Sequence, residues 1–334
     1  MCGIIRITRF FRRVFALDKN IETTGAAVVA PKKKSKFKKS HLQLYSLCSI
    51  PVILVFIFSY IPLYGLLICF KDYKYSKGIL GSPWVGFDNF KFYVMSNDFT
   101  RTLWNTLELN IIFIVSGIIA AVLVAVLLFE ITSRNATKVY QTVLITPHFV
   151  SWIIAAYIVY AILSPEYGIL NKLIEALGGT AVAWYNTPEA WTWILLVCSV
   201  WKHVGMDCVV YYAALMGIDT SLFEAAKIDG ANKVQIAWYI TIPTLTPLIT
   251  ILTILKIGSI FRADFGLFYQ VPMDTGALYS RTDVIDTYIY RVFRQIGNLS
   301  MSTAIGFLQS IVGFCMVMIT NAVVKKFDPS RALF

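Results

Sequence analysis

The sequence predicts an all-α, polytopic membrane protein with six transmembrane helices, and its composition is the first observation behind this prediction. Of its 334 residues, 57% are hydrophobic and only 15% are charged. A soluble domain has about 45–50% apolar and about 25% charged residues. Two further observations agree: the chain contains long apolar stretches, and its basic residues are unevenly distributed. Together they exclude a water-soluble globular fold.

Six stretches are long enough to cross a membrane as helices, because a hydrocarbon layer about 30 Å thick takes about 20 helical residues. Pro62 is expected to kink the first of them, since proline removes a backbone N–H from a helix. The six stretches are residues 43–70, 104–131, 142–163, 190–215, 244–263 and 302–324.

Residues 1–41 are expected to form a cytosolic segment that precedes a transmembrane domain of residues 42–334. Within it, residues 3–17 place apolar side chains on one helical face and arginines opposite, as in a helix lying in the membrane interface. A disordered tail with the same pattern is the alternative. Six of the residues 32–39 are lysines, and 11 of the 30 lysines and arginines precede residue 42. Since basic segments are retained in the cytosol, both termini are predicted to be cytosolic.

The polar residues show no catalytic or metal-binding pattern. The six cysteines are scattered, without metal-ligand spacing. The chain has no Gly-x-x-x-x-Gly-Lys-Ser/Thr phosphate cradle and no Ser/His/Asp or paired-carboxylate set that stands out. We therefore expect no enzymatic activity, no metal and no cofactor in this chain. Its net charge of +11 is attributed to membrane orientation rather than nucleic-acid binding, because the rest of the chain suits lipid.

Between the fourth and fifth stretches, the sequence predicts a short helix, a tight turn and a second helix. Ser221 and Glu224 have the spacing of a capping box, in which each side chain satisfies the other residue's backbone N–H. The first helix would span residues 222–228, and Gly230 would end it with a positive φ. A second apolar segment covers residues 234–240, and Pro243 would mark the entry to the next transmembrane stretch.

This segment resembles the EAA loop of ABC importer permeases. In that family the loop, here at about residues 216–243, is the coupling helix that docks into a cleft on a cytosolic ATPase. A capped turn without a partner is the alternative interpretation. The residues of the resemblance, which match without a gap, are Glu224, Ala225, Ala226, Asp229, Gly230, Ala231 and Pro243.

Flanking segments at residues 85–90, 146–152 and 282–291 resemble the LplB-like carbohydrate and polysaccharide branch of these permeases, which is related to MalF. The resemblance implies a MetI-like permease fold in the bacterial inner membrane and import of an oligosaccharide or polysaccharide fragment. This chain would form half of the translocation path. ATP and Mg would be bound by a partner. The implied partners are a second permease subunit, two ABC ATPase subunits, a lipid-anchored or periplasmic carbohydrate-binding protein, and membrane lipid.

Polar side chains within the apolar stretches are candidates for the substrate path, since ionisable residues in lipid usually face a bundle interior or water. On a continuous helix, His148, Ser151 and Trp152 would share one face. That face could instead bind the second permease. The candidate path residues are His148, Ser151, Trp152, Lys256 and Ser259.

Two other interpretations remain open for the polar residues. Lys202, His203 and Asp207 could snorkel to the membrane surface or form a local ion pair. Alternatively, the chain could be a self-sufficient ion- or proton-coupled transporter that uses His148, His203 and Asp207. Such a transporter predicts an inverted sequence repeat, and we find none.

Overall fold

The computed structural model describes the backbone of residues 39–327 and the side chains of residues 45–326. The expected amphipathic helix and lysine block of the N-terminal segment lie outside the described residues. The chain divides into two units, residues 1–61 and 62–334, and each is described by itself. Throughout the described residues the regular structure is helical, apart from one isolated antiparallel bridge between Lys71 and Trp84.

In the first unit, α2 (Lys39–Val55) continues into a π-helical stretch, η2 (Phe56–Tyr60). The described side chains of this unit are exposed and mostly apolar, as expected of a lipid-facing helix. From residue 61 the backbone becomes a 3₁₀ helix, η3 (Ile61–Phe70), so Pro62 lies where the helix changes type. A proline lacks the N–H that a regular α-helix needs at this point.

The second unit contains the other membrane-spanning helices. Five helical stretches of the chain are long and apolar enough to cross a membrane, and a sixth span results if one bent pair is counted as one. This agrees with the prediction of six. The elements of these spans, after α2–η3, are α5 (Asn97–Phe129), α6 (Arg134–Phe149) with α7 (Trp152–Leu163), α9 (Pro188–Leu215), α11 (Lys233–Ile236) with η5 (Ala237–Thr241) and α12 (Ile242–Gly258), and α16 (Leu299–Phe327).

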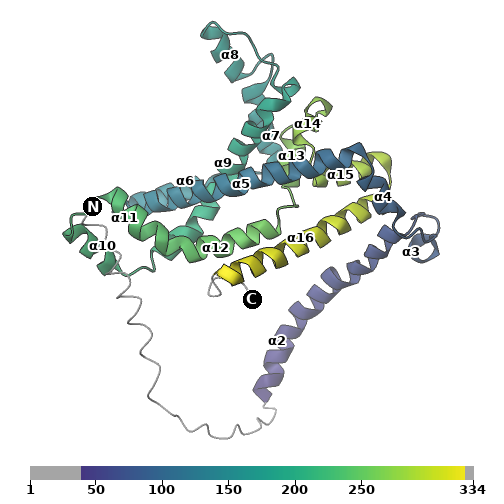
Figure 1. Ribbon diagram of the computed structural model, residues 1–334, viewed down its shortest axis with the longest axis horizontal. Coiled ribbons are helices and arrows are strands. Elements are labelled where there is room, and N and C mark those ends of the chain that lie inside the picture. Colours follow the sequence, from purple (N-terminus) through teal and green to yellow (C-terminus); the bar gives the residue numbers. More distant parts are fainter. Residues whose placement is uncertain (1–38, 328–334) are drawn as a thin grey trace. The chain divides into compact units, whose positions relative to one another are not determined.

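Shorter helices occupy the connections. Figure 1 shows α10 at one end of α5, and α4 and α15 at the other. The short elements are α3 (Gly78–Gly81), α4 (Asp88–Val94), α8 (Ile169–Ala176), η4 (Trp184–Asn186), α10 (Thr220–Ile228), α13 (Phe265–Gln270), η6 (Gly276–Leu278), α14 (Tyr279–Thr282), α15 (Ile285–Arg291) and η7 (Val292–Ile296).

The packing centres on α9, which lies against both α5 and α6, while α12 packs on α16. Trp191 and Leu195 of α9 are fully buried against Leu267 of α13 at one end, and Leu215 is buried against Leu245 of α12 at the other. Outside these contacts the spans expose long apolar faces. Such faces are compatible with lipid or a second membrane subunit, because lipid tails are as apolar as the side chains themselves.

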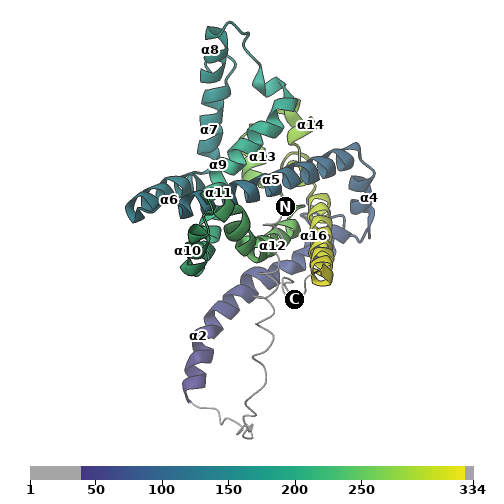
Figure 2. The same cartoon turned by 60° about the vertical axis from the view of Figure 1, so that its left-hand side comes forward.

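The third predicted span is not one continuous helix. The chain is helical to Phe149, extended at Val150 and Ser151, and helical again from Trp152. The two helices meet at an angle of 96°, and Figure 2 shows α7 running nearly perpendicular to α6. Therefore His148, Ser151 and Trp152 do not share a helical face, and that prediction is wrong.

Candidate functional site

The first part of the site is α10, the helix between the fourth and fifth spans. It starts at Thr220, with Asp219 as its N-cap: the Asp219 carboxylate accepts a hydrogen bond from the Ser221 N–H at 3.0 Å. This bond lowers the pKa of the Asp219 carboxyl. The predicted Ser221–Glu224 capping box is wrong, because Ser221 already lies inside the first turn and cannot be the cap.

The end of α10 has the predicted turn. Gly230 adopts a φ of 79°, which an L side chain tolerates poorly. The Ala231 N–H donates to the Ala226 carbonyl at 2.9 Å, and the Gly230 N–H donates to the Lys227 carbonyl at 3.0 Å. These two bonds form a Schellman motif, which satisfies carbonyls that the helix end would otherwise leave free. The sequence prediction of a glycine turn is confirmed.

One side of α10 is anchored and the other is exposed. Phe223, 8% exposed, packs on Phe129 at the end of α5, with ring centroids 5.2 Å apart. Glu224 and Ile228 face outward, and Ile228 is 85% exposed. Among the described residues the Glu224 carboxylate has no ion-pair or hydrogen-bond partner. The helix therefore presents an acidic and apolar surface on a rigid anchor.

The second segment is not a separate helix, contrary to the prediction. It begins with a capping box between Asn232 and Gln235, and continues through η5 and α12 as the first turns of the fifth span. Pro243 lies inside this span rather than at its entrance. The π-helical turn just before it bonds the Ile242 N–H to the Ala237 carbonyl, which changes the bonding pattern where the proline donor is missing.

The second part of the site is the break in the third span, where Lys202 of α9 binds the free end of α6. Its ammonium donates to the carbonyls of Pro147, His148 and Val150, with a distance of 3.0 Å to His148. It also lies 5.0 Å from the centre of the Trp152 ring and is only 7% exposed. A cation at a helix C-terminus complements both the free carbonyls and the helix dipole. Lys202 thus neither snorkels nor pairs with Asp207.

Trp152 connects the break to a residue that sequence analysis missed. Its indole Nε1 donates to the Asp264 carboxylate at 2.8 Å, and His203 Nε2 lies 3.9 Å from the same oxygen. Asp264 is also the N-cap of α13, accepting from the Leu267 N–H. An aspartate directly before an apolar run was an available N-cap signal, and it lies just beyond the fifth stretch predicted at residues 244–263. Gly266 leaves room for the indole, since a Cβ there would lie 2.1 Å from a Trp152 carbon.

The remaining predicted path residues lie on α12. Lys256 forms an ion pair with Asp207 of α9 at 2.6 Å. Asp207 therefore takes part in an ion pair, but its partner is Lys256 rather than Lys202 or His203. Ser259 caps the end of α12 and donates to the Lys256 carbonyl at 3.0 Å. It also lines a separate cavity of about 200 Å³ against α16. The structure therefore brings His148 and Trp152 together around Lys202 and His203, and it places Ser259 elsewhere.

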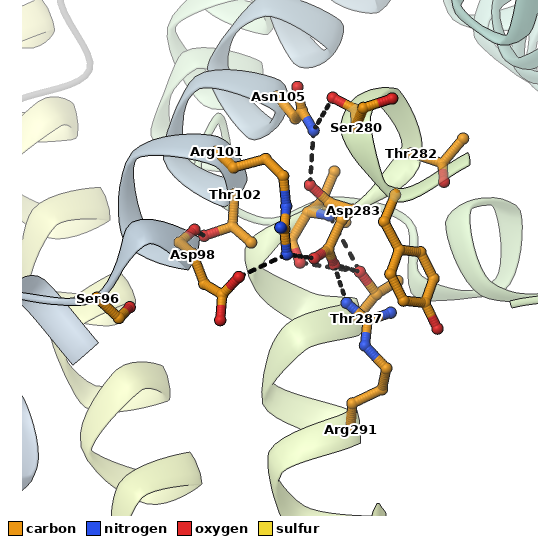
Figure 3. A network of polar contacts seen from close by, with 12 residues as sticks. Ser96, Asp98, Arg101, Thr102, Asn105, Ser280, Thr282, Asp283, Thr287 and Arg291 are labelled. Atoms are coloured by element: carbon orange, nitrogen blue, oxygen red, sulfur yellow. Dashed lines mark hydrogen bonds and ion pairs between the residues drawn. The ribbon is translucent and has the colours of Figure 1, made fainter. Parts of the chain in front are cut away.

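A third polar cluster lies at the opposite end from α10 (Figure 3). The Asp283 side chain, 0% exposed, accepts from Arg101 of α5 at 2.7 Å and from Arg291 of α15. Its Oδ1 also accepts from the Thr287 hydroxyl at 2.9 Å, and its backbone carbonyl accepts from Asn105 at 3.0 Å. A buried carboxylate is tolerable here because two cations and a hydroxyl replace water. The cluster holds the start of α5 to the segment before the sixth span.

These features define a class of protein: a polytopic membrane protein with a capped helix exposed on one side and polar groups gathered at a broken span. A family model described as "Binding-protein-dependent transport system inner membrane component" matches residues 114–330. The chain belongs to this family of ABC transporter permeases.

Several characterised relatives are similar over most of their length. Protein LplB of Bacillus subtilis (strain 168) is 37% identical over 84% of this chain and 87% of its own. The polygalacturonan/rhamnogalacturonan transport system permease protein YteP of the same organism is 33% identical over 88% of this chain and 93% of its own. A solved structure of a bacterial alginate ABC transporter, in complex with an alginate pentasaccharide-bound periplasmic protein, contains a chain with 31% identity and a TM-score of 0.78; the match covers 86% of this chain and 96% of that one.

Proposed function

We propose that this chain imports an oligosaccharide or polysaccharide fragment, as one permease of an ATP-driven transporter, and that α10 is its coupling helix. The proposed partners are a second permease, two cytosolic ATPases that hold ATP and Mg, and an external carbohydrate-binding protein. In this arrangement α10 and both termini face the cytosol of a bacterial cell, and the membrane is its inner membrane.

The observation that carries this proposal is the construction of α10. It is anchored by Phe223, closed by the Gly230 turn, and exposes Glu224 and Ile228 without a partner in the described residues. A rigid helix with an unpaired carboxylate and an apolar tip suits docking in a groove that offers basic and apolar groups. The saccharide class is supported by the names of YteP and of the alginate transporter.

We propose further that the substrate passes the break in the third span, near His148, Ser151, Trp152 and Lys256. Backbone carbonyls and an indole gather at the break, and the Lys256–Asp207 ion pair joins the neighbouring helices α9 and α12. A sugar that leaves water needs such groups, because each unpaired hydroxyl in an apolar site costs about 2–7 kcal/mol. Ser259 would contribute only from its separate cavity beside α16.

The alternative of a self-sufficient ion-coupled transporter finds no support in the comparisons. The family is described as dependent on a binding protein, YteP is named a transport system permease protein, and the alginate transporter was solved in complex with a periplasmic protein. Two of the three polar residues that the alternative invoked are engaged: Asp207 pairs with Lys256, and His203 lies beside Asp264, whereas the buried Nδ1 of His148 has no hydrogen-bond partner in the described residues.

The proposal is tested by changing α10 without changing the spans. Glu224→Ala removes the free carboxylate, and Gly230→Val forces a β-branched residue into a positive φ. We expect both variants to assemble in the membrane but to lose at least tenfold in substrate-stimulated ATP hydrolysis, about 1.4 kcal/mol of coupling. Gly178→Val is the matched control, because Gly178 also has a positive φ but lies in the turn after α8.

The measurement is ATP hydrolysis by the purified transporter in lipid, with and without saccharide-loaded binding protein. Wild-type stimulation in both the Glu224 and Gly230 variants would refute the coupling role of α10. Equal losses in the Gly178 control would show that the effect comes from backbone strain in general.

A further inference from the structure

One feature that the proposed function does not explain is a cleft between α7 and α13. It has a volume of about 310 Å³, which falls at the small end of the range of ligand pockets, about 300–1,000 Å³. Its side-chain lining includes Tyr157 of α7, Tyr269 and Gln270 of α13, and Met273 and Asp274 just beyond. The two helices pack together on the side of the break away from α6.

Two tyrosines provide the aromatic surface of this cleft. Tyr269 is held rigidly, because its ring stacks on Phe265 with centroids 5.0 Å apart and meets Tyr290 edge-on at 4.9 Å. Tyr157 projects from α7 and is 66% exposed. An aromatic ring that is both fixed and accessible offers a flat apolar face together with a polar edge.

The polar groups of the cleft are suited to hydroxyls rather than to a charged ligand. The Gln270 amide, which can both donate and accept, has no hydrogen-bond partner among the described residues. The Asp274 carboxylate is already neutralised: it lies 3.1 Å from Arg291 and accepts from the Tyr279 hydroxyl at 2.9 Å. No uncompensated charge therefore faces the cleft.

Two residues that line the cleft, Met273 and Asp274, have an unfavourable backbone conformation. Met273 and Asp274 have φ values of 55° and 46°, the only positive values outside glycine in the described residues. Consecutive non-glycine residues in the left-handed conformation cost of order 1–3 kcal/mol each. They persist only where the surrounding structure holds them in that conformation. Here the side chain of Asp274 is fixed by Arg291 and Tyr279, while that of Met273 lines the cleft.

We propose that this cleft binds one sugar ring of the transported saccharide, on the side of the membrane opposite α10. The apolar face of the ring would lie on Tyr157 and Tyr269, and its hydroxyls would bond to Gln270 and to the free oxygen of Asp274. The assignment rests on the proposed saccharide import. It adds a binding site that the saccharide would occupy before it reaches the break in the third span. The chemistry selects a ring with several hydroxyls and does not require a carboxylate.

The test uses the complete transporter in lipid with its binding protein. The probes are alginate pentasaccharide, oligogalacturonate and the neutral maltopentaose. Tyr157→Ala and Gln270→Ala are each expected to raise about tenfold the saccharide concentration that half-maximally stimulates ATP hydrolysis. Tyr160→Ala is the matched control, because Tyr160 is on the same helix but packs on Tyr185 outside the cleft.

A second measurement reports on the cleft directly. Gln270→Cys is introduced into a chain in which the exposed Cys48 and Cys315 are replaced by serine, together with Cys2, which lies outside the described residues. The active saccharide should slow maleimide labelling at position 270 at least fivefold, whereas labelling of Tyr160→Cys should not change. Protection at position 270 together with shifted half-maximal concentrations supports the proposal.

The remaining outcomes separate the two claims. If the wild type is stimulated while the Tyr157 and Gln270 variants behave like the Tyr160 control, the site is wrong and saccharide import stands. If either variant loses the second permease on purification, the cleft is a subunit contact and the site is also wrong. A wild-type transporter that none of the three probes stimulates would contradict saccharide import itself, and the site with it.

Discussion

The indole of Trp152 donates a hydrogen bond to the carboxylate of Asp264 across 112 residues of sequence, at a distance of 2.8 Å. Trp152 is the first residue of α7, and Asp264 is the N-cap of α13. The bond therefore joins the helix that follows the break in the third span to the helix that follows the fifth span. We expect Trp152 and the neighbouring Gly266 to stabilise the geometry of the break.

Weakening this bond should loosen both helices. Trp152→Phe keeps an apolar ring but removes the donor, and hydrogen bonds to charged groups contribute about 1.5–3 kcal/mol. Gly266→Ala should displace the indole, since the new Cβ would lie 2.1 Å from its Cδ1. We expect both variants to lower the unfolding temperature of the purified transporter and to reduce saccharide uptake. Trp193→Phe, at an exposed position of α9, is the control. A Trp152→Phe protein as stable and active as that control would show that the bond has no role.

The buried ammonium of Lys202 should be needed for the break itself. Lys202→Met keeps the aliphatic stem but leaves the carbonyls of His148 and Val150 without their donor. Unsatisfied buried carbonyls cost about 1–3 kcal/mol each, so we expect a clear loss of thermal stability. The comparison is Lys172→Met on the exposed part of α8, which should change little. Similar melting of the two variants in detergent would contradict the capping role.

The Lys256–Asp207 pair predicts non-additive mutations. Lys256→Met leaves the Asp207 carboxylate unpaired between α9 and α12, and Asp207→Leu leaves the ammonium unpaired. The two side chains are 35% and 31% exposed, so the pair is half-buried, and removing one partner of such a pair is more harmful than replacing both by apolar groups. We expect the double variant to be more stable than the sum of the single losses predicts, by about 0.5–3 kcal/mol. A double-mutant cycle on the unfolding free energy measures this, and strict additivity would show that the pair is not coupled.

Asp286 predicts a pH dependence of stability. Burial raises the pKa of its carboxyl, against the opposing hydrogen bonds from the Ala263 N–H and the Gln309 amide. The fold thus favours the protonated form, so its contribution is fully present below the unfolded pKa and is lost as pH rises through the folded pKa. Asp286→Asn does not titrate. We expect the stability advantage of wild type over Asp286→Asn to shrink as pH rises from about 4 to 7. Melting temperatures across this range check it, and a growing advantage would reverse the assigned sign.

Topology is the fifth prediction. If α10 is cytosolic, a cysteine at Asp229 should react with a membrane-impermeant maleimide only after the cells are opened. A cysteine at Asp88, whose side chain is well exposed on α4, should react in intact cells. Asp283 is unsuitable for this purpose, because its side chain is fully buried between two arginines. Labelling at position 229 in intact cells would overturn the proposed orientation and the docking role of α10 with it.

Features that depend on local chemistry were predictable from the sequence. Long apolar runs specify membrane spans whatever surrounds them, because the length and apolarity of a helix decide whether it can cross the hydrocarbon layer. The turn after α10 was predictable for the same reason, since Gly230 needs a positive φ that is a property of one residue. The start of α10 was not, because Asp219 and Ser221 are both good caps and only one could be used.

The sequence by itself therefore determined the number of spans, the short helix between the fourth and fifth spans, and its glycine turn. Only the tertiary structure decided that the third span breaks, that Lys202 closes the break, and that Asp264 lies beside Trp152. The physical reason is that these groups are partners at long separation: Lys202 is 54 residues from the His148 carbonyl that it binds. A helix can be interrupted within the membrane only where another element supplies the missing hydrogen bonds. The residues around His148 contain no pattern that identifies this element.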